Sequence, residues 1–201
     1  MKRPHLRMLA LALLVAGIVG CRSATPSVNY FILRSVEAEV PSTAERETPT
    51  IRTVAVQPVE LPAPINRTQM VRRSGPNQLE ISAFNRWADY PDRLVQQVVE
   101  NNLEALTPRT RVVHHPWPPG LQPDVTVFIQ FRELIGTTDK KMLLTAEWTV
   151  IPSNNPTAGQ SRRTTLAEPI PGSGFDELAA AHSRVLAALC REVAQALNAG
   201  Q

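Results

Sequence analysis

Hydrophobic and polar residues alternate with two different periods along the chain, and two long stretches show the three- and four-residue steps of an amphipathic helix. The first covers residues 90–106 and the second covers residues 175–197. In each stretch the apolar residues form one continuous stripe, so each helix has a face that must be buried. Pro91 lies in the first turn of the first helix, where a missing N–H costs little. Thr107 precedes a proline and ends that helix.

Shorter runs rich in β-branched and aromatic residues predict strands. The predicted strands are 30–33, 53–59, 68–73, 77–82, 111–115, 125–131 and 142–151, with an optional edge strand at 161–167. Ser74-Gly75-Pro76 separates the third from the fourth and predicts a hairpin. A hairpin loop is expected at 136–141, and 37–49 is polar enough to predict a mobile loop.

This order of elements predicts an α/β fold, a two-layer sandwich in which a mixed, mostly antiparallel sheet of about six strands carries two amphipathic helices on one face. The 18 prolines cluster between the elements and mark loops, edges and turns. They divide the chain into segments without dividing it into domains. Residues 30–201 are therefore expected to form a single domain, a size that can bury a real core.

The first 21 residues follow the pattern of a lipoprotein signal peptide. A basic start is followed by an apolar run at 8–19, which is too short to span a membrane, and then by Gly20-Cys21. The resemblance to such signals implies cleavage between Gly20 and Cys21 and acylation of Cys21, including a palmitate-type chain. Residues 1–20 would then be removed and 21–29 would form a lipidated tether. The alternative is an ordinary secretory signal in which Cys21 has no role.

Removing the signal changes the charge of the protein. The full chain has a formal net charge of +3, but Lys2, Arg3 and Arg7 all lie in the signal. The remaining chain has 18 basic and 18 acidic residues. Nucleic-acid binding needs a basic surface that releases counterions from phosphates, so no nucleic-acid partner is expected.

Candidate chemistry is sparse. His114 and His115 are adjacent and would point to opposite faces of a strand, so they do not predict a metal site. His182 and Cys190 fall on the apolar stripe of the last helix, which favours a core histidine and a small buried thiol. No nucleophile elbow, phosphate-binding glycine loop or zinc-binding motif occurs. We therefore expect no enzyme activity, no cofactor and no metal.

Three segments carry a family resemblance. Residues 54–62 form a strand that ends in a Leu-Pro turn, residues 65–73 lead into a Val-Arg strand, and Arg86-Trp87-Ala88-Asp89 opens the first helix. Together they resemble the ABC-type transport auxiliary lipoprotein family, in its PqiC/YmbA-like branch. Asn66 and Thr68 stand where that family has Asp and Pro. About fifty residues carry the specific likeness, and the later elements match in order.

The resemblance implies a non-catalytic component that works with an ABC transporter and a periplasmic MCE-domain protein in envelope lipid transport. Acyl chains on Cys21 would anchor it at the periplasmic face of the outer membrane. The residue after the acylated cysteine is Arg22, whereas an aspartate at that position favours retention in the inner membrane. The implied role is to tether or cap the MCE assembly and so support membrane integrity. A homo-oligomeric ring would suit a cap, but the sequence does not give the subunit number.

Arg67, Arg86, Trp87 and Trp117 are the candidate partner contacts, because arginine and tryptophan dominate binding hot spots. Core packing at the helix start is the alternative role of Trp87. Two other functions stay open. One is a scaffold lipoprotein for outer-membrane assembly, whose partner would be a β-barrel. The other is a periplasmic lipid-binding carrier, which would need a sizeable apolar cavity.

Overall fold

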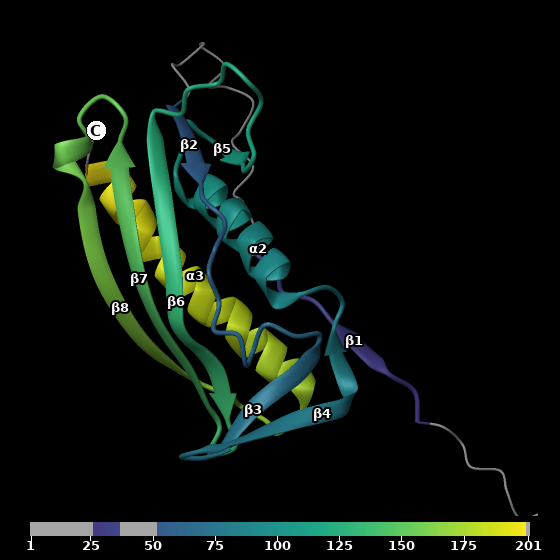
Figure 1. The fold of residues 1–201 in the computed structure, drawn as a ribbon. Helices are drawn as coiled ribbons and strands as arrows, with labels where there is room; N and C mark the ends of the chain where they lie inside the picture. Colours follow the sequence, from purple (N-terminus) through teal and green to yellow (C-terminus); the bar gives the residue numbers. More distant parts are fainter. Residues whose placement is uncertain (1–25, 37–51, 200–201) are drawn as a thin grey trace, which may run out of the picture.

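A computed structural model describes residues 26–36 and 52–199 (Figure 1). The predicted signal peptide, Cys21 and the predicted loop at 37–49 lie outside the described residues. The strands are β1 Asn29–Phe31, β2 Arg52–Val56, β3 Gln69–Gly75, β4 Gln78–Trp87, β5 Thr110–His114, β6 Val125–Thr137, β7 Lys141–Pro152 and β8 Gln160–Pro169. The helices are α2 Pro91–Leu106, α3 Phe175–Ala199 and the short 3-10 helix η1 Pro156–Ala158. The described part of the chain thus confirms the predicted α/β sandwich, with eight strands where about six were expected.

The sheet branches at β6. On one side β6 pairs antiparallel with β7, and β7 pairs with β8, which is the predicted edge strand. On the other side the start of β6 pairs with β2 and its end pairs with β3, both in parallel. β5 extends the first branch beyond β2, whereas β4 and then β1 extend the second beyond β3. The longest ladders are antiparallel, as predicted, and four shorter ones are parallel.

β6 is longer than the sequence predicts, because a bulge breaks its alternation. Up to Phe131 the odd-numbered residues face the core. The register against β7 shifts between Phe131 and Glu133, after which Leu134 is buried instead. The loop to β7 is correspondingly shorter than the predicted 136–141, since β6 continues to Thr137 and β7 begins at Lys141.

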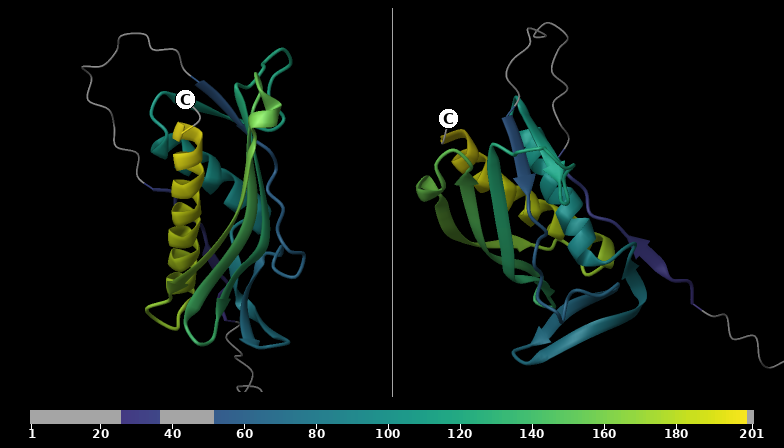
Figure 2. Two further views of the ribbon diagram at one scale, coloured as in Figure 1. Left: turned by 90° about the vertical axis from the view of Figure 1, so that its left-hand side faces the viewer. Right: turned by 45° about the horizontal axis from the view of Figure 1, so that its top comes forward.

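α2 and α3 pack on one face of the curled sheet, as Figure 2 shows from two sides. One cluster of buried residues joins the two helices to the inner faces of β2, β6 and β7. Trp148 of β7 is 1% exposed, and its indole N–H donates to the Thr164 hydroxyl of β8 at 3.0 Å. A Cβ at Gly136 would lie only 2.2 Å from Leu178 Cδ1, so glycine lets α3 approach the end of β6 closely.

The predicted hairpin is confirmed as β3 and β4, with Pro76-Asn77 between the strands instead of Ser74-Gly75-Pro76. β4 continues to Trp87, well past the predicted end at residue 82, and its last three residues pair with β1. The first helix also begins and ends where predicted, with Pro91 in its first turn and Thr107 as its C-cap.

Candidate functional site

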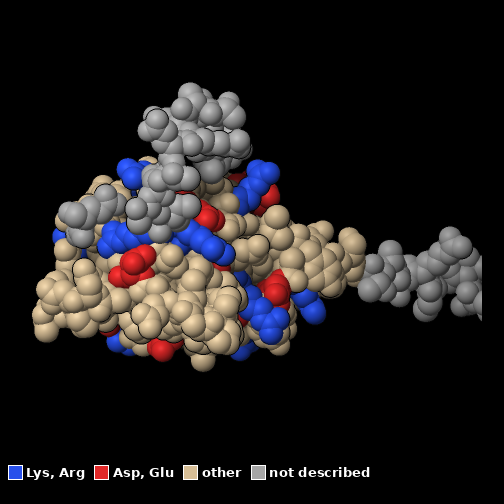
Figure 3. All heavy atoms as spheres, turned by 90° about the horizontal axis from the view of Figure 1, so that it is seen from above, with Lys and Arg blue, Asp and Glu red and all other residues tan. Residues whose placement is uncertain are grey.

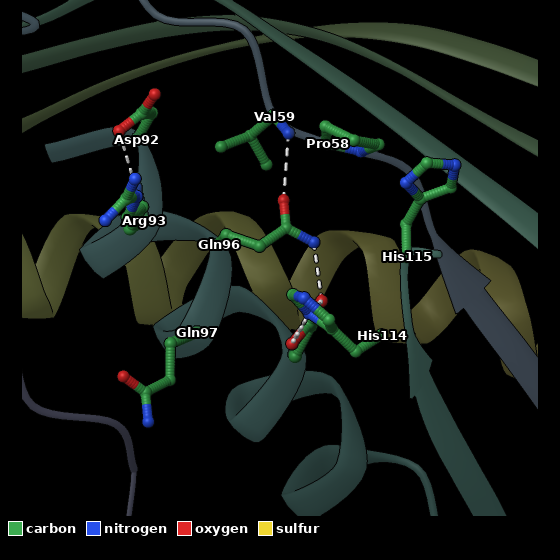
Figure 4. A pocket seen from close by; sticks show the side chains of 9 residues that line it. Pro58, Val59, Asp92, Arg93, Gln96, Gln97, His114 and His115 are labelled. Carbon is green, nitrogen blue, oxygen red and sulfur yellow. Dashed lines mark hydrogen bonds and ion pairs between the residues drawn. The ribbon is translucent and has the colours of Figure 1, made fainter. Parts of the chain in front are cut away.

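An open groove runs along α2, at the point where the chain leaves β2. Pro58 cannot donate a ladder hydrogen bond, so β2 ends at Val56. Beyond it the chain follows β6 through a single bridge between Glu60 and Gln130. The space between this segment, α2 and the end of β5 has a volume of about 530 Å³ (Figure 4). Its lining residues are Pro58, Val59, Asp92, Arg93, Gln96, Gln97, Glu100, His114 and His115.

A chain of hydrogen bonds fixes the floor of this groove. The backbone N–H of Val59 donates to Gln96 Oε1 at 2.8 Å, and Gln96 Nε2 donates to Glu100 Oε1 at 2.5 Å. His114 Nδ1 lies 3.1 Å from the same carboxylate oxygen. The chain of bonds connects the segment after β2, the helix α2 and the strand β5 across the floor of the groove.

The groove is polar and of mixed charge. Apart from Pro58 and Val59, every residue that lines it is polar or charged. Figure 4 shows the rings of His114 and His115 pointing apart, as expected for neighbours at a strand end. On the face drawn in Figure 3, basic and acidic side chains lie next to each other instead of forming a patch of one sign. This arrangement offers both hydrogen-bond donors and acceptors to a protein surface.

Two of the four predicted contacts flank the groove. At the Asp92 end, Asn66 Nδ2 donates to Asp92 Oδ2 and the backbone N–H of Asp92 donates to Asn66 Oδ1, both at 3.2 Å. These bonds place the segment that carries Arg67 beside the groove. At the His115 end, the half-buried Trp117 packs edge-on against the His115 ring, with 5.3 Å between centroids. The sequence did not indicate that Arg67 and Trp117 border one surface.

Trp87 is not an exposed anchor, which corrects its assignment as a contact. It is 6% exposed, its backbone N–H donates to Thr68 O at 2.7 Å, and its ring meets His182 edge-on at 5.2 Å. The last residue of β4 points inward under α3, so the packing alternative is confirmed. Arg86 precedes it on the opposite face of β4, is half-buried and pairs in register with Tyr30 of β1.

Sequence reasoning missed Gln96 and Glu100. Their spacing places both on one face of α2 and could have predicted the bond between them. The contact of Glu100 with His114 depends on β5 lying beside α2, and no local pattern indicates that.

The two titratable groups on the buried face of α3 are structural, as predicted. His182 Nδ1 lies 2.8 Å from Leu178 O, and burial lowers the pKa of His182 to about 4. Burial raises the pKa of the Cys190 thiol to about 12, so the thiolate that would react is not formed at neutral pH. Within 26–36 and 52–199, no three His, Cys, Asp or Glu residues gather as metal ligands. No helix in those same ranges is long and apolar enough to cross a membrane.

Comparison with known proteins bears on the family and the fold of this chain. The model of the family described as "ABC-type transport auxiliary lipoprotein component" matches residues 33–194. A crystal structure of an uncharacterised protein aligns with a TM-score of 0.69 and 18% identity, covering 86% of this chain and 99% of that one. A crystal structure of a protein from Xanthomonas campestris, in family DUF330, aligns with a TM-score of 0.61 and 14% identity. The alignment covers 86% of this chain and 100% of that one. No curated protein matches the chain. Because the family model spans most of the sequence, the chain belongs to the ABC-type transport auxiliary lipoprotein component family.

Proposed function

We propose that this protein is a non-catalytic, lipid-anchored periplasmic component of an MCE/ABC-type envelope lipid transport system. Acyl chains on Cys21 hold it at the outer membrane, where it tethers or caps the MCE assembly. The observation that carries the proposal is the family match over residues 33–194, preceded by the lipoprotein-type signal that ends at Cys21. One acyl chain gives only marginal membrane binding, whereas several on one residue give a stable anchor.

The groove along α2 is the surface that contacts the MCE-domain protein. Hydrogen bonds already hold the Gln96 side chain in the floor of the groove, so binding costs little ordering of that side chain. Arg67 follows Asn66, which bonds to Asp92 at one end, and Trp117 packs on His115 at the other; these residue types dominate hot spots in protein interfaces. Arg86 is a further contact, on the outer face of β4. An anchored domain also raises the effective concentration of its binding surface near the membrane.

A lipid carrier would need an enclosed apolar cavity, and the apolar cavity found among the described residues is small. The apolar cavity beside Trp87 and His182 measures about 20 Å³. That is close to the space of one water molecule and far from that of an acyl chain. The scaffold alternative differs in its partner, a β-barrel in place of an MCE-domain protein, so partner identity separates the two.

A crosslinked pull-down of the full-length protein from membranes tests the proposal. We expect to recover an MCE-domain protein together with an ABC permease or ATPase. Arg67→Ala and Trp117→Ala should each weaken binding by roughly thirty-fold, the effect of losing about 2 kcal/mol at a hot spot. Arg191→Ala on α3 and Phe128→Ala on the outer face of β6 are matched controls, since both side chains are exposed away from the groove.

Recovery of a β-barrel would favour the scaffold, and recovery of lipid alone would favour the carrier. Unchanged binding in both groove variants would remove the groove as the contact surface. An unmodified Cys21 in the N-terminal peptide, measured by mass spectrometry, would contradict the anchor.

A further inference from the structure

Exposed apolar side chains concentrate on one margin of the molecule. Among residues 26–36 and 52–199, eight large apolar residues have substantial exposure, and seven of them lie on β1, on β4 or within three residues of one of them; Phe128 is the eighth. We call these seven the β1–β4 margin: Val28, Tyr30, Ile32, Leu79, Ile81, Phe84 and Tyr90. Tyr30 and Ile32 are the most exposed, at 66% and 61%. In Figure 1, β4 runs along the lower border of the sheet and β1 leads away from it.

The sheet topology leaves this margin open. β1 is the last strand of its branch, and it covers β4 only at residues 85–87. Among the described strands, the remaining length of β4 is paired with β3 alone. A long apolar edge strand of this kind is a site where another surface attaches.

The proposal concerns what covers this margin. We propose that the β1–β4 margin rests on the phospholipid bilayer in which the acyl chains of Cys21 are anchored. The inference builds on the lipidation of Cys21 in the proposed function. Val28 is seven positions after Cys21, so even a fully extended chain holds Val28 within about 25 Å of the anchor. Of the described residues, β1 and its neighbours are therefore those most closely confined to the membrane surface.

The chemistry of the margin matches a lipid surface. Tyr30 and Tyr90 have rings that prefer the boundary between acyl chains and headgroups, where one end of the side chain is apolar and the other is hydrated. The two carboxylates beside margin residues, Glu80 and Asp89, are paired with Arg72 and Arg93, so they do not leave the margin with a net negative charge. The segment nearest the anchor is basic. From Cys21 to Val36 the chain has Arg22 and Arg34 and no acidic residue. These cations would meet lipid phosphates on the same side as the acyl anchor.

Docking has a consequence for the function. An acyl anchor alone leaves the domain free to turn on its tether. Contact along both β1 and β4 prevents the domain from rotating relative to the bilayer. It thereby holds α2 and its groove in one orientation for the partner.

Fluorescence quenching in vesicles tests this inference with the full-length, acylated protein. A bromo- or nitroxide-labelled lipid serves as the quencher in phosphatidylethanolamine–phosphatidylglycerol vesicles, at less than one protein per vesicle. An environment-sensitive probe is attached through Ile32→Cys, Ile81→Cys or Phe128→Cys. Cys190 is buried and does not compete for the label, because burial also raises the pKa of its thiol. The Phe128 position is the matched control, an exposed apolar residue outside the margin.

We expect lipid quenching at the Ile32 and Ile81 positions to exceed that at Phe128 at least three-fold. Equal quenching at all three positions would overturn the inference. So would shielding of the Ile81 probe that appears only when several copies or the MCE-domain protein are added, since the margin would then be a protein interface. The mass of the Cys21 peptide from the same sample reports acylation separately, so failure of the anchor and failure of the docking give different results.

Discussion

Two parts of the sheet, β7 with β8 and β4 with β1, use their side chains differently. In β7, which lies between β6 and β8 and under α3, alternate residues such as Leu144, Ala146 and Trp148 are buried. In β4, most residues are exposed, including Leu79 and Ile81. The two strands differ little in apolar content, so their neighbours decide the outcome. The part of the sheet formed by β7 and β8 supplies stability, and the part formed by β4 and β1 keeps apolar surface available for contact.

Removing Trp148, the largest fully buried side chain, should cause the largest loss of stability. Trp148→Ala is expected to lower the free energy of unfolding by about 3–5 kcal/mol, because it leaves a cavity and takes away the donor to Thr164. Phe128→Ala, on the opposite face of the neighbouring strand, should cost less than about 1 kcal/mol. Urea titration of both variants makes the measurement. Equal losses would mean that the buried face of β7 does not dominate stability.

Lowering the pH should weaken the same core through His182. Its pKa falls from 6.5 to about 4 in the folded protein, because burial disfavours the charged ring. Between those values the unfolded chain binds more protons than the folded one, so stability decreases as the pH falls from about 6.5 to about 4. The loss is of the order of 3 kcal/mol and does not grow further below pH 4. His182→Gln should remove this part of the pH dependence in urea titrations. A variant that kept the full dependence would assign it to other groups.

The smallest effect is expected on the β1–β4 margin. Ile81→Ser should change the free energy of unfolding by less than about 0.5 kcal/mol, because the side chain is 47% exposed and already contacts water. In vesicles, the same substitution should reduce the quenching by labelled lipid of a probe attached at the Ile32 position. A loss of stability comparable to that of Trp148→Ala would show that the margin belongs to the core.

How far the sequence predicts this structure depends on the range of the interactions. Both helices and the β3–β4 hairpin were predictable, since their periods and turn residues are local in sequence. The second half of β6 was not, because the bulge between Phe131 and Glu133 changes which residues face inward. The branching of the sheet at β6 was also not predictable from the sequence pattern. It depends on registers such as Val54 with Val125 and Arg72 with Gly136, which no single segment encodes.

The candidate site was predictable only in pieces. Arg67 and Trp117 were identified as contact types, but fifty residues separate them in the sequence. Their relation to one groove follows from the bonds of Asn66 to Asp92 and from the packing of Trp117 on His115. Trp87 shows the reverse case, because a residue type common at interfaces here fills the core.

Site-specific photocrosslinking in living cells tests the account most directly. A photoreactive amino acid replaces Gln97, exposed in the groove, or Ile81, exposed on the β1–β4 margin, in the full-length chain. The account predicts that the Gln97 position captures an MCE-domain protein and that the Ile81 position captures phospholipid. Capture of a β-barrel at Gln97, or of the MCE-domain protein at Ile81 and not at Gln97, would contradict it.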